Sequence, residues 1–403
     1  MFTDKILSDY ADVVIWGLKT AREETHGKAK PGDIVVISCD PGTMELVELI
    51  DERAIKEGWH TETRIAGTDN MVYNFYKNAT NEQLGFIMPW AKLRAESING
   101  YIAIMADNDL FNLESIDPKR FSIGALARKP LRDIWDKRES EGKFGWSLAA
   151  YPTIAQASQT KMSLREYTNQ IIKACYLDQK DPVRAWMDLK EEAERIKQWL
   201  WNLDIEFIHV ESERTDLVAG LGKGRRFMGV SGHNIPSFEI FTSPDWRLLG
   251  GKFYAEVASF RAGQYVKGVE ILFKEGEAIS ATAEEGNDLL QAQLDTDKGA
   301  RRVGELSFTD RRHSKIDKFL ASTLFDENYG GKYGNCHIAL GKSFVDCYEH
   351  PSKIGDKEEA AKLGFNDSAI HWDFVNQEDK VVTATLRDGS KKVIYASGEF
   401  QLE

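Results

Sequence analysis

The sequence predicts two differently built domains: an α/β domain over residues 1–204 and an α+β domain rich in antiparallel strands over residues 205–403. With 403 residues, the chain is longer than one ordinary hydrophobic core accommodates, so two domains are expected. In the first half, short uninterrupted apolar runs alternate with helical periodicity, which is typical of parallel strands connected by helices. After Asp204, frequent glycines and alternating polar and apolar residues indicate antiparallel strands and tight turns.

The first half is predicted to begin with an amphipathic helix and to continue as a strand–helix–strand unit. The expected elements are a helix over residues 4–20, a strand at 34–37, a helix over 44–57, and strands at 61–65 and 100–106. The turn after the first strand, CDPGTMEL, has neither the GxGxxG pattern nor the P-loop pattern that cradles phosphates. We therefore expect a scaffold here rather than a nucleotide site.

Residues 126–204 are expected to be mostly helical, with one more strand within 146–153. Ser163, followed three residues later by Glu166, matches a capping box that starts a helix. Asp181-Pro182 starts the next helix, because proline is favoured in a first turn. The apolar stripes of these helices are typical of core packing rather than of cofactor binding.

The second half is expected to consist of strands and two helices. The tetrapeptide Arg387-Asp388-Gly389-Ser390 lies between two alternating runs and predicts a β-hairpin. The expected strands lie at 205–210, 253–260, 265–273, 381–386 and 391–395, and the expected helices at 284–295 and 314–324.

Charge and cysteine content restrict the compartment and the partners. The formal net charge of −12 argues against nucleic acid or an anionic membrane as a partner, because both require a positive surface. The four cysteines form no CxxC pair, which favours reduced thiols and a cytoplasmic location. The N-terminal segment has charges too close together for a signal peptide, and no run reaches the roughly 18 apolar residues of a spanning helix. We expect a soluble cytoplasmic protein.

The triplet His371-Trp372-Asp373 is the sharpest local signal for chemistry. In a strand, residues i and i+2 point to the same face, so the imidazole and the carboxylate project together. Apolar residues flank the triplet and imply burial, and a buried carboxylate needs a cation or several donors. Taken alone, such a triplet is as often structural as functional.

Three further residues complete a candidate ligand set in the second half. His337 lies in the apolar run CHIALG, Glu239 lies in IPSFEIFTSP beside turn-forming residues, and Glu305 follows Gly304. Taken singly, the histidine is more often a core residue, and each carboxylate is more often part of a salt bridge. Two imidazoles and three carboxylates together favour first-row divalent metals.

The strings NIPSFEIFTSP, ARRVGEL, DEN, CHIALG and NDSAIHWDF, in this order, resemble the thermophilic-type metallo-aminopeptidases of the aminopeptidase T and aminopeptidase S type. The resemblance implies a catalytic domain over residues 205–403 and a two-metal exopeptidase, usually a homodimer, that acts on peptides with a free N-terminus. It implies Zn, Co, Mn or Mg as the ions. It places the metal ligands at Glu239, Glu305, His337, His371 and Asp373.

One departure from the family pattern concerns a tyrosine that assists the reaction. The family has this tyrosine shortly after the HIALG segment, whereas Phe344 stands at that place here. Tyr348 is the nearest tyrosine after the segment, and we assign it as the catalytic hydroxyl. Two alternatives stay open: Tyr329 or Tyr333 reaches the site from the link before Cys336, or the role of the hydroxyl is lost.

The expected mechanism is attack of a metal-bridging water on the peptide carbonyl, with Glu305 serving both as a ligand and as a proton carrier. Two alternatives stay open at this point. His337, His371 and Asp373 form the ligand set of a mononuclear non-haem Fe(II) ring-cleaving dioxygenase. The second alternative is a non-catalytic protein that binds peptides or serves as a scaffold.

Overall fold

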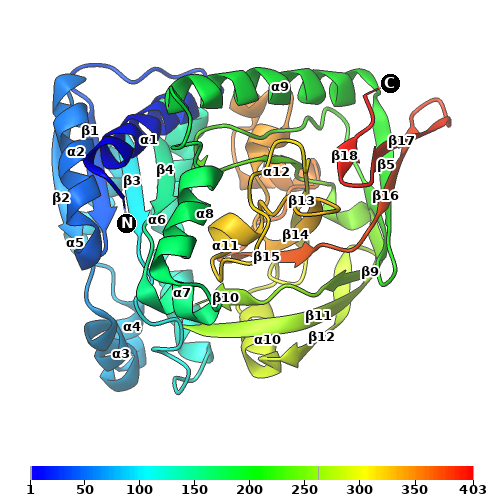
Figure 1. The fold of residues 1–403 in the computed structure, drawn as a ribbon. Helices are drawn as coiled ribbons and strands as arrows, with labels where there is room; N and C mark the ends of the chain where they lie inside the picture. Colours follow the sequence, from blue (N-terminus) through cyan, green and yellow to red (C-terminus); the bar gives the residue numbers. More distant parts are fainter. Residues whose placement is uncertain (1, 262, 403) are drawn as a thin grey trace. The chain divides into compact units, whose positions relative to one another are not determined.

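The computed structural model describes residues 2–261 and 263–402 (Figure 1), which divide into two compact units. Unit 1 comprises Met1–Ile116, Leu126–Lys190 and Val230–Ser237, and unit 2 comprises Asp117–Ala125, Glu191–Gly229 and Phe238–Glu403. The units therefore exchange segments along the chain and do not part at a single position. A boundary between independently folding domains at residue 204 stays a prediction.

Unit 1 is built on a five-stranded sheet in which all described strand pairs are parallel. The order is β2-β1-β3-β4-β7, with β1 at Ile34–Cys39, β2 at His60–Ile65, β3 at Gly100–Met105, β4 at Gly145–Ala150 and β7 at Asn234–Ile235. The first two helices pack together, and the buried side chains Tyr10, Val14 and Leu18 line the inner face of α1. The predicted α/β architecture is confirmed.

Four helices of the first half begin where the sequence predicts, at Asp4, Met44, Leu164 and Pro182, whereas the helices over residues 69–97 were not predicted. The residue pair Ser163 and Glu166 forms the predicted capping box of α8. The helices are α1 (Asp4–Glu24), α2 (Met44–Lys56), α3 (Asp69–Asn78), α4 (Asn81–Gly85), α5 (Pro89–Ser97), α6 (Lys119–Ser140), α7 (Ile154–Gln159), α8 (Leu164–Ala174) and α9 (Pro182–Asn202). Among the described helices, none is long and apolar enough to cross a membrane.

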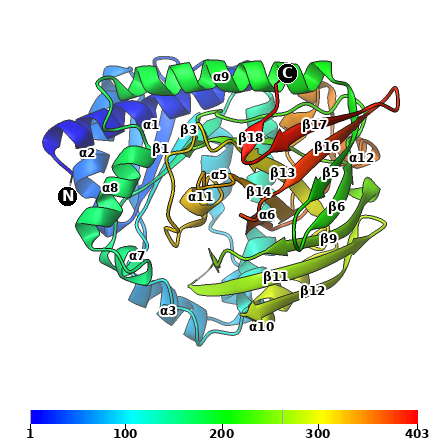
Figure 2. The ribbon, with the colours of Figure 1, turned by 45° about the vertical axis from the view of Figure 1, so that its right-hand side comes forward.

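Unit 2 contains two antiparallel sheets, which confirms the prediction for the second half. The larger sheet has the order β10-β11-β9-β6-β5-β16-β17-β18, with β12 paired to β11 in the long hairpin seen in Figure 2. Its strands are β5 (Ile205–Glu211), β6 (Asp216–Gly220), β9 (Leu249–Ala255), β10 (Ser259–Arg261), β11 (Gln264–Lys274), β12 (Glu277–Glu285), β16 (Val381–Leu386), β17 (Lys391–Ala396) and β18 (Glu399–Phe400).

The smaller sheet has the order β15-β14-β13-β8 and carries the predicted donors. Its strands are β8 (Glu239–Thr242), β13 (Val303–Thr309), β14 (Asn335–Gly341) and β15 (His371–Asn376). The remaining helices of unit 2 are α10 (Asn287–Leu294), α11 (Thr323–Asp326) and α12 (Lys357–Lys362). Short 3-10 turns lie at Trp246–Leu248, Val345–Cys347 and Pro351–Lys353 in unit 2 and at Pro41–Thr43 in unit 1.

The predicted helix over residues 314–324 is wrong, because the chain there is irregular until α11 begins. The Asp326 carboxylate accepts hydrogen bonds from the backbone N–H groups of Leu320 and Ser322. Ala321 adopts a left-handed backbone, with φ of 51°. Such local side chain–backbone bonds compete with a helix, and the apolar spacing alone does not reveal them.

Candidate metal centre

The small sheet of unit 2 brings the predicted donors onto one face. Ala339 on β14 lies opposite Glu305 on β13 and opposite Asp373 on β15, so these three side chains share a face. Side chains alternate along a strand, so His337 and His371, each two residues from a member of this row, project to the same side. The register therefore confirms the prediction that His371 and Asp373 project to the same face of their strand.

The fifth donor lies on the same face, and the other face of the sheet is apolar. Glu239 pairs with Thr309, which is four residues beyond Glu305 on β13. The opposite face carries fully buried side chains, namely Leu306, Phe308, Ile338 and Phe374. The sheet thus combines an ordinary hydrophobic core on one side with buried charged groups on the other.

Gly304 gives Glu305 its orientation. The pairing of β13 with β14 shifts register between Val303 and Glu305, which marks a β-bulge. A Cβ atom at Gly304 would lie 2.1 Å from the backbone oxygen of Lys342, so only glycine fits. Gly304 therefore lies inside a buried strand and not in a turn.

The donor atoms of the five residues converge. His337 Nε2 lies 3.1 Å from Glu305 Oε1 and 3.2 Å from Glu239 Oε2. His371 Nε2 lies 3.5 Å from Glu305 Oε2 and 3.5 Å from Asp373 Oδ1. Of these residues, His337 is 1% exposed and Glu305 is 4% exposed. The structure therefore brings all five predicted ligands into one cluster, in which His371 and Asp373 are partly exposed and the other three residues are buried.

The charges of this cluster depend on one another. Burial opposes the charge of His337, but hydrogen bonds with Glu239 and Glu305 outweigh it and raise the pKa of His337 well above its ordinary value. Burial likewise opposes the charge of His371, and the Asp373 and Glu305 carboxylates raise its pKa to about 10. Burial favours the neutral form of Glu305 and Asp373, yet the imidazoles lower the pKa of both.

Burial, followed by the neighbouring Glu305 among other groups, raises the pKa of Glu239 despite its bond to His337. Three buried carboxylates in one cluster therefore need more positive charge than neutral imidazoles supply. Divalent cations supply it, and they displace protons from the ligands when they bind.

The hydrogen bond of His371 also suits metal ligation. His371 Nδ1 lies 2.9 Å from the backbone oxygen of Lys342, and a carbonyl only accepts, so Nδ1 carries the proton. When a bound metal displaces the other proton of the ring, the lone pair of Nε2 faces the carboxylates, which is the usual arrangement of metal-bound histidine. His337 Nδ1 is buried and has no hydrogen-bond partner within the described residues. The donor set thus fits first-row divalent metals.

Comparison with known proteins identifies the family from which this site comes. The chain matches the family described as thermophilic metalloprotease (M29) over residues 3–400. It belongs to that family. The resemblance inferred from the five sequence motifs is confirmed, as is the expectation of a metal-dependent hydrolase.

The relatives of this metalloprotease cover almost its whole length. The chain is 29% identical to Aminopeptidase 2 of Geobacillus stearothermophilus, over 99% of this chain and 98% of the relative. It is 26% identical to Aminopeptidase T of Thermus thermophilus, over 92% of this chain and 94% of the relative. The solved structure of wild-type AmpT from Thermus thermophilus has the same fold, with a TM-score of 0.77 and 22% identity over 98% of this chain and 99% of that chain. None of these comparisons supports a dioxygenase or a non-catalytic protein.

Strand β10 holds the His371-Trp372-Asp373 segment of the metalloprotease in place. Arg261 Nη1 donates to the backbone oxygen of His371 at 2.8 Å, and its guanidinium lies 5.4 Å from the Trp372 ring centroid. The Trp372 indole N–H donates to Ser259 Oγ at 2.9 Å. These contacts anchor Trp372, which lies between the donors His371 and Asp373 in the strand and points to the opposite face of the sheet.

Glu327 is a functional candidate that the sequence analysis missed. It is buried, and its pKa is raised well above the ordinary value by burial and then by the nearby Asp373 and Glu239 carboxylates. Its backbone oxygen accepts a hydrogen bond from Asn335 Nδ2, which fixes the chain beside the start of β14. The sequence signal for Glu327 is the DEN string, which is one of the motifs shared with the family.

Among the described contacts, none joins Tyr348 to the five donors. Its described contacts are a backbone bridge with Arg225 and ring contacts with His350 and Phe365. Phe344, by contrast, lies against the His371 ring, with 4.9 Å between ring centroids. A catalytic role for Tyr348 stays a prediction, whereas Phe344 contacts a candidate ligand.

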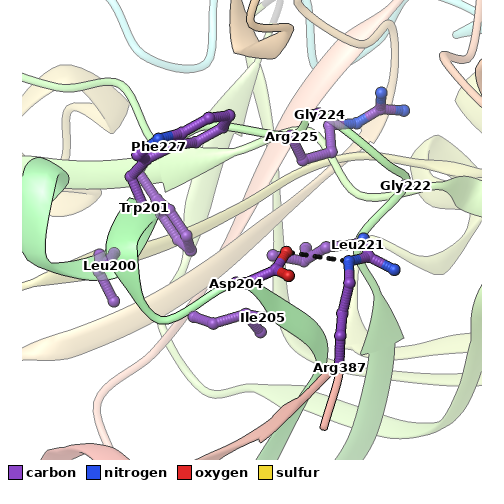
Figure 3. A pocket seen from close by; sticks show the side chains of 10 residues that line it. All are labelled: Leu200, Trp201, Asp204, Ile205, Leu221, Gly222, Gly224, Arg225, Phe227 and Arg387. Atoms are coloured by element: carbon purple, nitrogen blue, oxygen red, sulfur yellow. Dashed lines mark hydrogen bonds and ion pairs between the residues drawn. The ribbon is translucent and has the colours of Figure 1, made fainter.

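A cavity of about 230 Å³ opens in unit 2 away from these residues (Figure 3). None of its ten lining residues belongs to the five donors. At its rim Arg387 Nε donates to Asp204 Oδ1 at 3.0 Å, while Arg225 stacks on Phe365 and donates to backbone oxygens. The candidate metal centre is therefore located by its cluster of donor side chains and not by this cavity.

Proposed function

We propose that this metalloprotease is an aminopeptidase that removes the N-terminal residue of peptides and holds two divalent ions, Zn, Co, Mn or Mg. The proposed ligands are Glu239, Glu305, His337, His371 and Asp373. The observation that carries the proposal is the convergence of five nitrogen and oxygen donors, three of them buried, from four adjacent strands on one face. Buried Glu327 adds a further carboxylate to their surroundings.

The ions, when bound, supply an activated water at neutral pH and stabilise the oxyanion that forms from the peptide carbonyl. Glu305 is the carboxylate that reaches both imidazoles, through Oε1 to His337 and through Oε2 to His371. We propose that Glu305 would help to hold the ions and would transfer a proton to the leaving amine. The Lys342 carbonyl and the Ser307 hydroxyl, which donates to Glu239 Oε2 at 3.1 Å, hold the ligands in orientation.

A cluster rich in carboxylates explains the proposed requirement for a free amino terminus. The amine is the one group of a peptide's N-terminal residue that both a metal and a carboxylate bind well. A blocked N-terminus loses this contact, so blocked peptides should not be substrates.

We also propose a cytoplasmic location and a homodimer. All four cysteines are buried free thiols, namely Cys39, Cys175, Cys336 and Cys347. Unbridged thiols are usual in a reducing compartment, which supports the first of these proposals.

A release assay tests the activity. The purified protein is treated with a chelator, dialysed, and then given Co, Zn, Mn or Mg in turn with aminoacyl-p-nitroanilides or short peptides. We expect no release after chelation, recovery with at least one ion, and no release from N-acetylated peptides. Release that survives chelation, or equal release from acetylated peptides, would contradict the proposal. Ring cleavage of a dihydroxypyridine with Fe(II) would favour the dioxygenase instead.

A further inference from the structure

The cavity of about 230 Å³ in unit 2 has apolar walls and a charged mouth (Figure 3). Apart from Arg225, the buried side chains of its lining are all apolar, namely Leu200, Ile205, Leu221 and Phe227. Trp201, Asp204 and Arg387 are exposed, so they form its opening. The volume suits one small molecule, because drug-sized ligands occupy pockets of roughly 300–1,000 Å³.

The charges at the mouth are one acid and one base held side by side. Arg387 Nε donates to Asp204 Oδ1 at 3.0 Å, and the Arg387 backbone N–H donates to the Asp204 backbone oxygen at 3.1 Å. The main chain thus fixes both positions, one between α9 and β5 and the other directly after β16. Within the described residues, the second carboxylate oxygen of Asp204 and the terminal nitrogens of Arg387 have no further hydrogen-bond partner. Both groups can therefore bind a ligand without losing a protein contact.

The other arginine of the lining has its partners elsewhere. The Arg225 guanidinium stacks on the Phe365 ring, 3.5 Å from its centroid, and donates to the backbone oxygens of Ser243 and Leu363. The mouth therefore offers one positive and one negative group rather than a cluster of one sign. A simple anion would match Arg387 and leave the neighbouring carboxylate unmatched.

A ligand that matches this mouth carries opposite charges on neighbouring atoms, since the two protein groups are in hydrogen-bond contact. A free α-amino acid has this arrangement, because its ammonium and carboxylate groups are bonded to the same carbon. Its side chain projects away from both charges, as the apolar walls lie away from the charged mouth. A peptide of several residues separates its two terminal charges and fits less well.

We propose that this cavity binds a free α-amino acid with a large apolar side chain. The ammonium group donates to Asp204, the carboxylate accepts from Arg387, and the side chain lies against Trp201, Leu221 and Phe227. Charge-assisted hydrogen bonds and the burial of apolar surface stabilise the complex. Amino acids of this class are products of the proposed aminopeptidase, and that link alone rests on the proposed function. The binding itself does not depend on the metal centre.

Titration calorimetry of L-leucine into chelated protein tests the site, because chelation prevents binding of the amino acid to metal ions. We expect saturable binding in the millimolar range or tighter. Glycine, L-leucinamide and N-acetyl-L-leucine should each bind at least about tenfold more weakly, since each lacks one of the three contacts. These analogues probe the unmodified chain, so the test does not depend on the folding of a variant.

Variants assign each contact to its residue. Arg387→Gln should weaken L-leucine binding about tenfold or more and should no longer distinguish L-leucine from L-leucinamide. Asp204→Asn should weaken it similarly and no longer distinguish L-leucine from N-acetyl-L-leucine. Asparagine tolerates the left-handed backbone of Asp204, with φ of 47°, so the turn is kept. Arg301→Gln removes an exposed ion pair of the same unit, with Asp295 at 2.7 Å, and is the matched control that should bind normally.

Circular dichroism checks the folding of all three variants. Absence of L-leucine binding to the unmodified chelated protein at millimolar concentrations would overturn the proposal, as would unchanged affinity in both Arg387→Gln and Asp204→Asn. Binding that appears only after a metal ion is added back would place the amino acid at the metal centre and would also overturn it. If chelated protein binds L-leucine as expected but metal-loaded protein releases nothing from peptides, the aminopeptidase proposal fails and this one stands.

Discussion

The parallel sheet of unit 1 and the four-stranded sheet of unit 2 both have strands in a hydrophobic core, but they differ in the residues that they bury. Strand β1 places apolar side chains such as Val36 and Ile37 in the core, and its residues carry no charge. Strands β13 and β14 are buried along their whole length, yet one face of them holds Glu305 and His337. Burying charge is unfavourable unless the groups are paired, so the second sheet has a chemical role that the first lacks.

The largest expected effect comes from removing charge on the polar face while keeping its shape. Glu305→Gln should lower kcat/KM on the order of 10³-fold or more, because Glu305 contacts both imidazoles and is a proposed ligand of the ions. Steady-state release kinetics measure the effect, and Glu213→Gln is a control at an exposed position of the same unit. Activity within about twofold of the unmodified protein would remove Glu305 from the site.

The two faces of β14 should respond differently to changes of volume. Ala339→Leu places a large side chain between Glu305 and Asp373 and should reduce metal content without removing a donor. Ile338→Val on the apolar face should lower the free energy of unfolding by about 0.5–1.5 kcal/mol and leave metal content unchanged. Metal analysis and chemical denaturation of both variants check this, and equal metal content in the two would contradict the assignment of faces.

Arg261→Gln should have an intermediate effect, since Arg261 contacts the backbone of His371 and not a donor atom. Loss of such supporting contacts typically weakens metal affinity about 10- to 100-fold. Competition with a chromogenic chelator measures the affinity. Arg261→Lys, which keeps the charge and loses the planar fork, should recover part of it, and unchanged affinity in both variants would contradict the positioning role.

The smallest expected effects concern the missing tyrosine. Phe344→Tyr adds a hydroxyl beside His371 and should raise kcat by about tenfold with little change in KM, as added oxyanion donors do. Tyr348→Phe tests the sequence-based assignment, which predicts a loss of kcat. If Tyr348→Phe is as active as the unmodified protein, Tyr348 is not the catalytic hydroxyl.

Much of the fold and the ligand set could be predicted because both follow short-range rules. Apolar periodicity located β1, α2 and the β16–β17 hairpin, and alternation along a strand placed His371 and Asp373 on one face. The family motifs, read in order, supplied the other ligands. Long-range contacts could not be predicted in this way.

Three features of the structure illustrate that limit. The bulge at Gly304 depends on the position of the Lys342 carbonyl, 38 positions later in the chain. The irregular path before α11 depends on the Asp326 carboxylate. Glu327 becomes a candidate only when β14 and β15 lie beside it. The spacing of residues in the sequence does not reveal these contacts.

The most direct test of the central claim is the number of metal ions that each chain binds when it is active. Chelated protein is titrated with Zn or Co, and bound metal and release of an aminoacyl-p-nitroanilide are measured on the same samples. We expect each chain to bind two ions and to become fully active only as the second site fills. One ion per chain with full peptidase activity, or two ions still bound by Glu305→Gln with undiminished release, would contradict it.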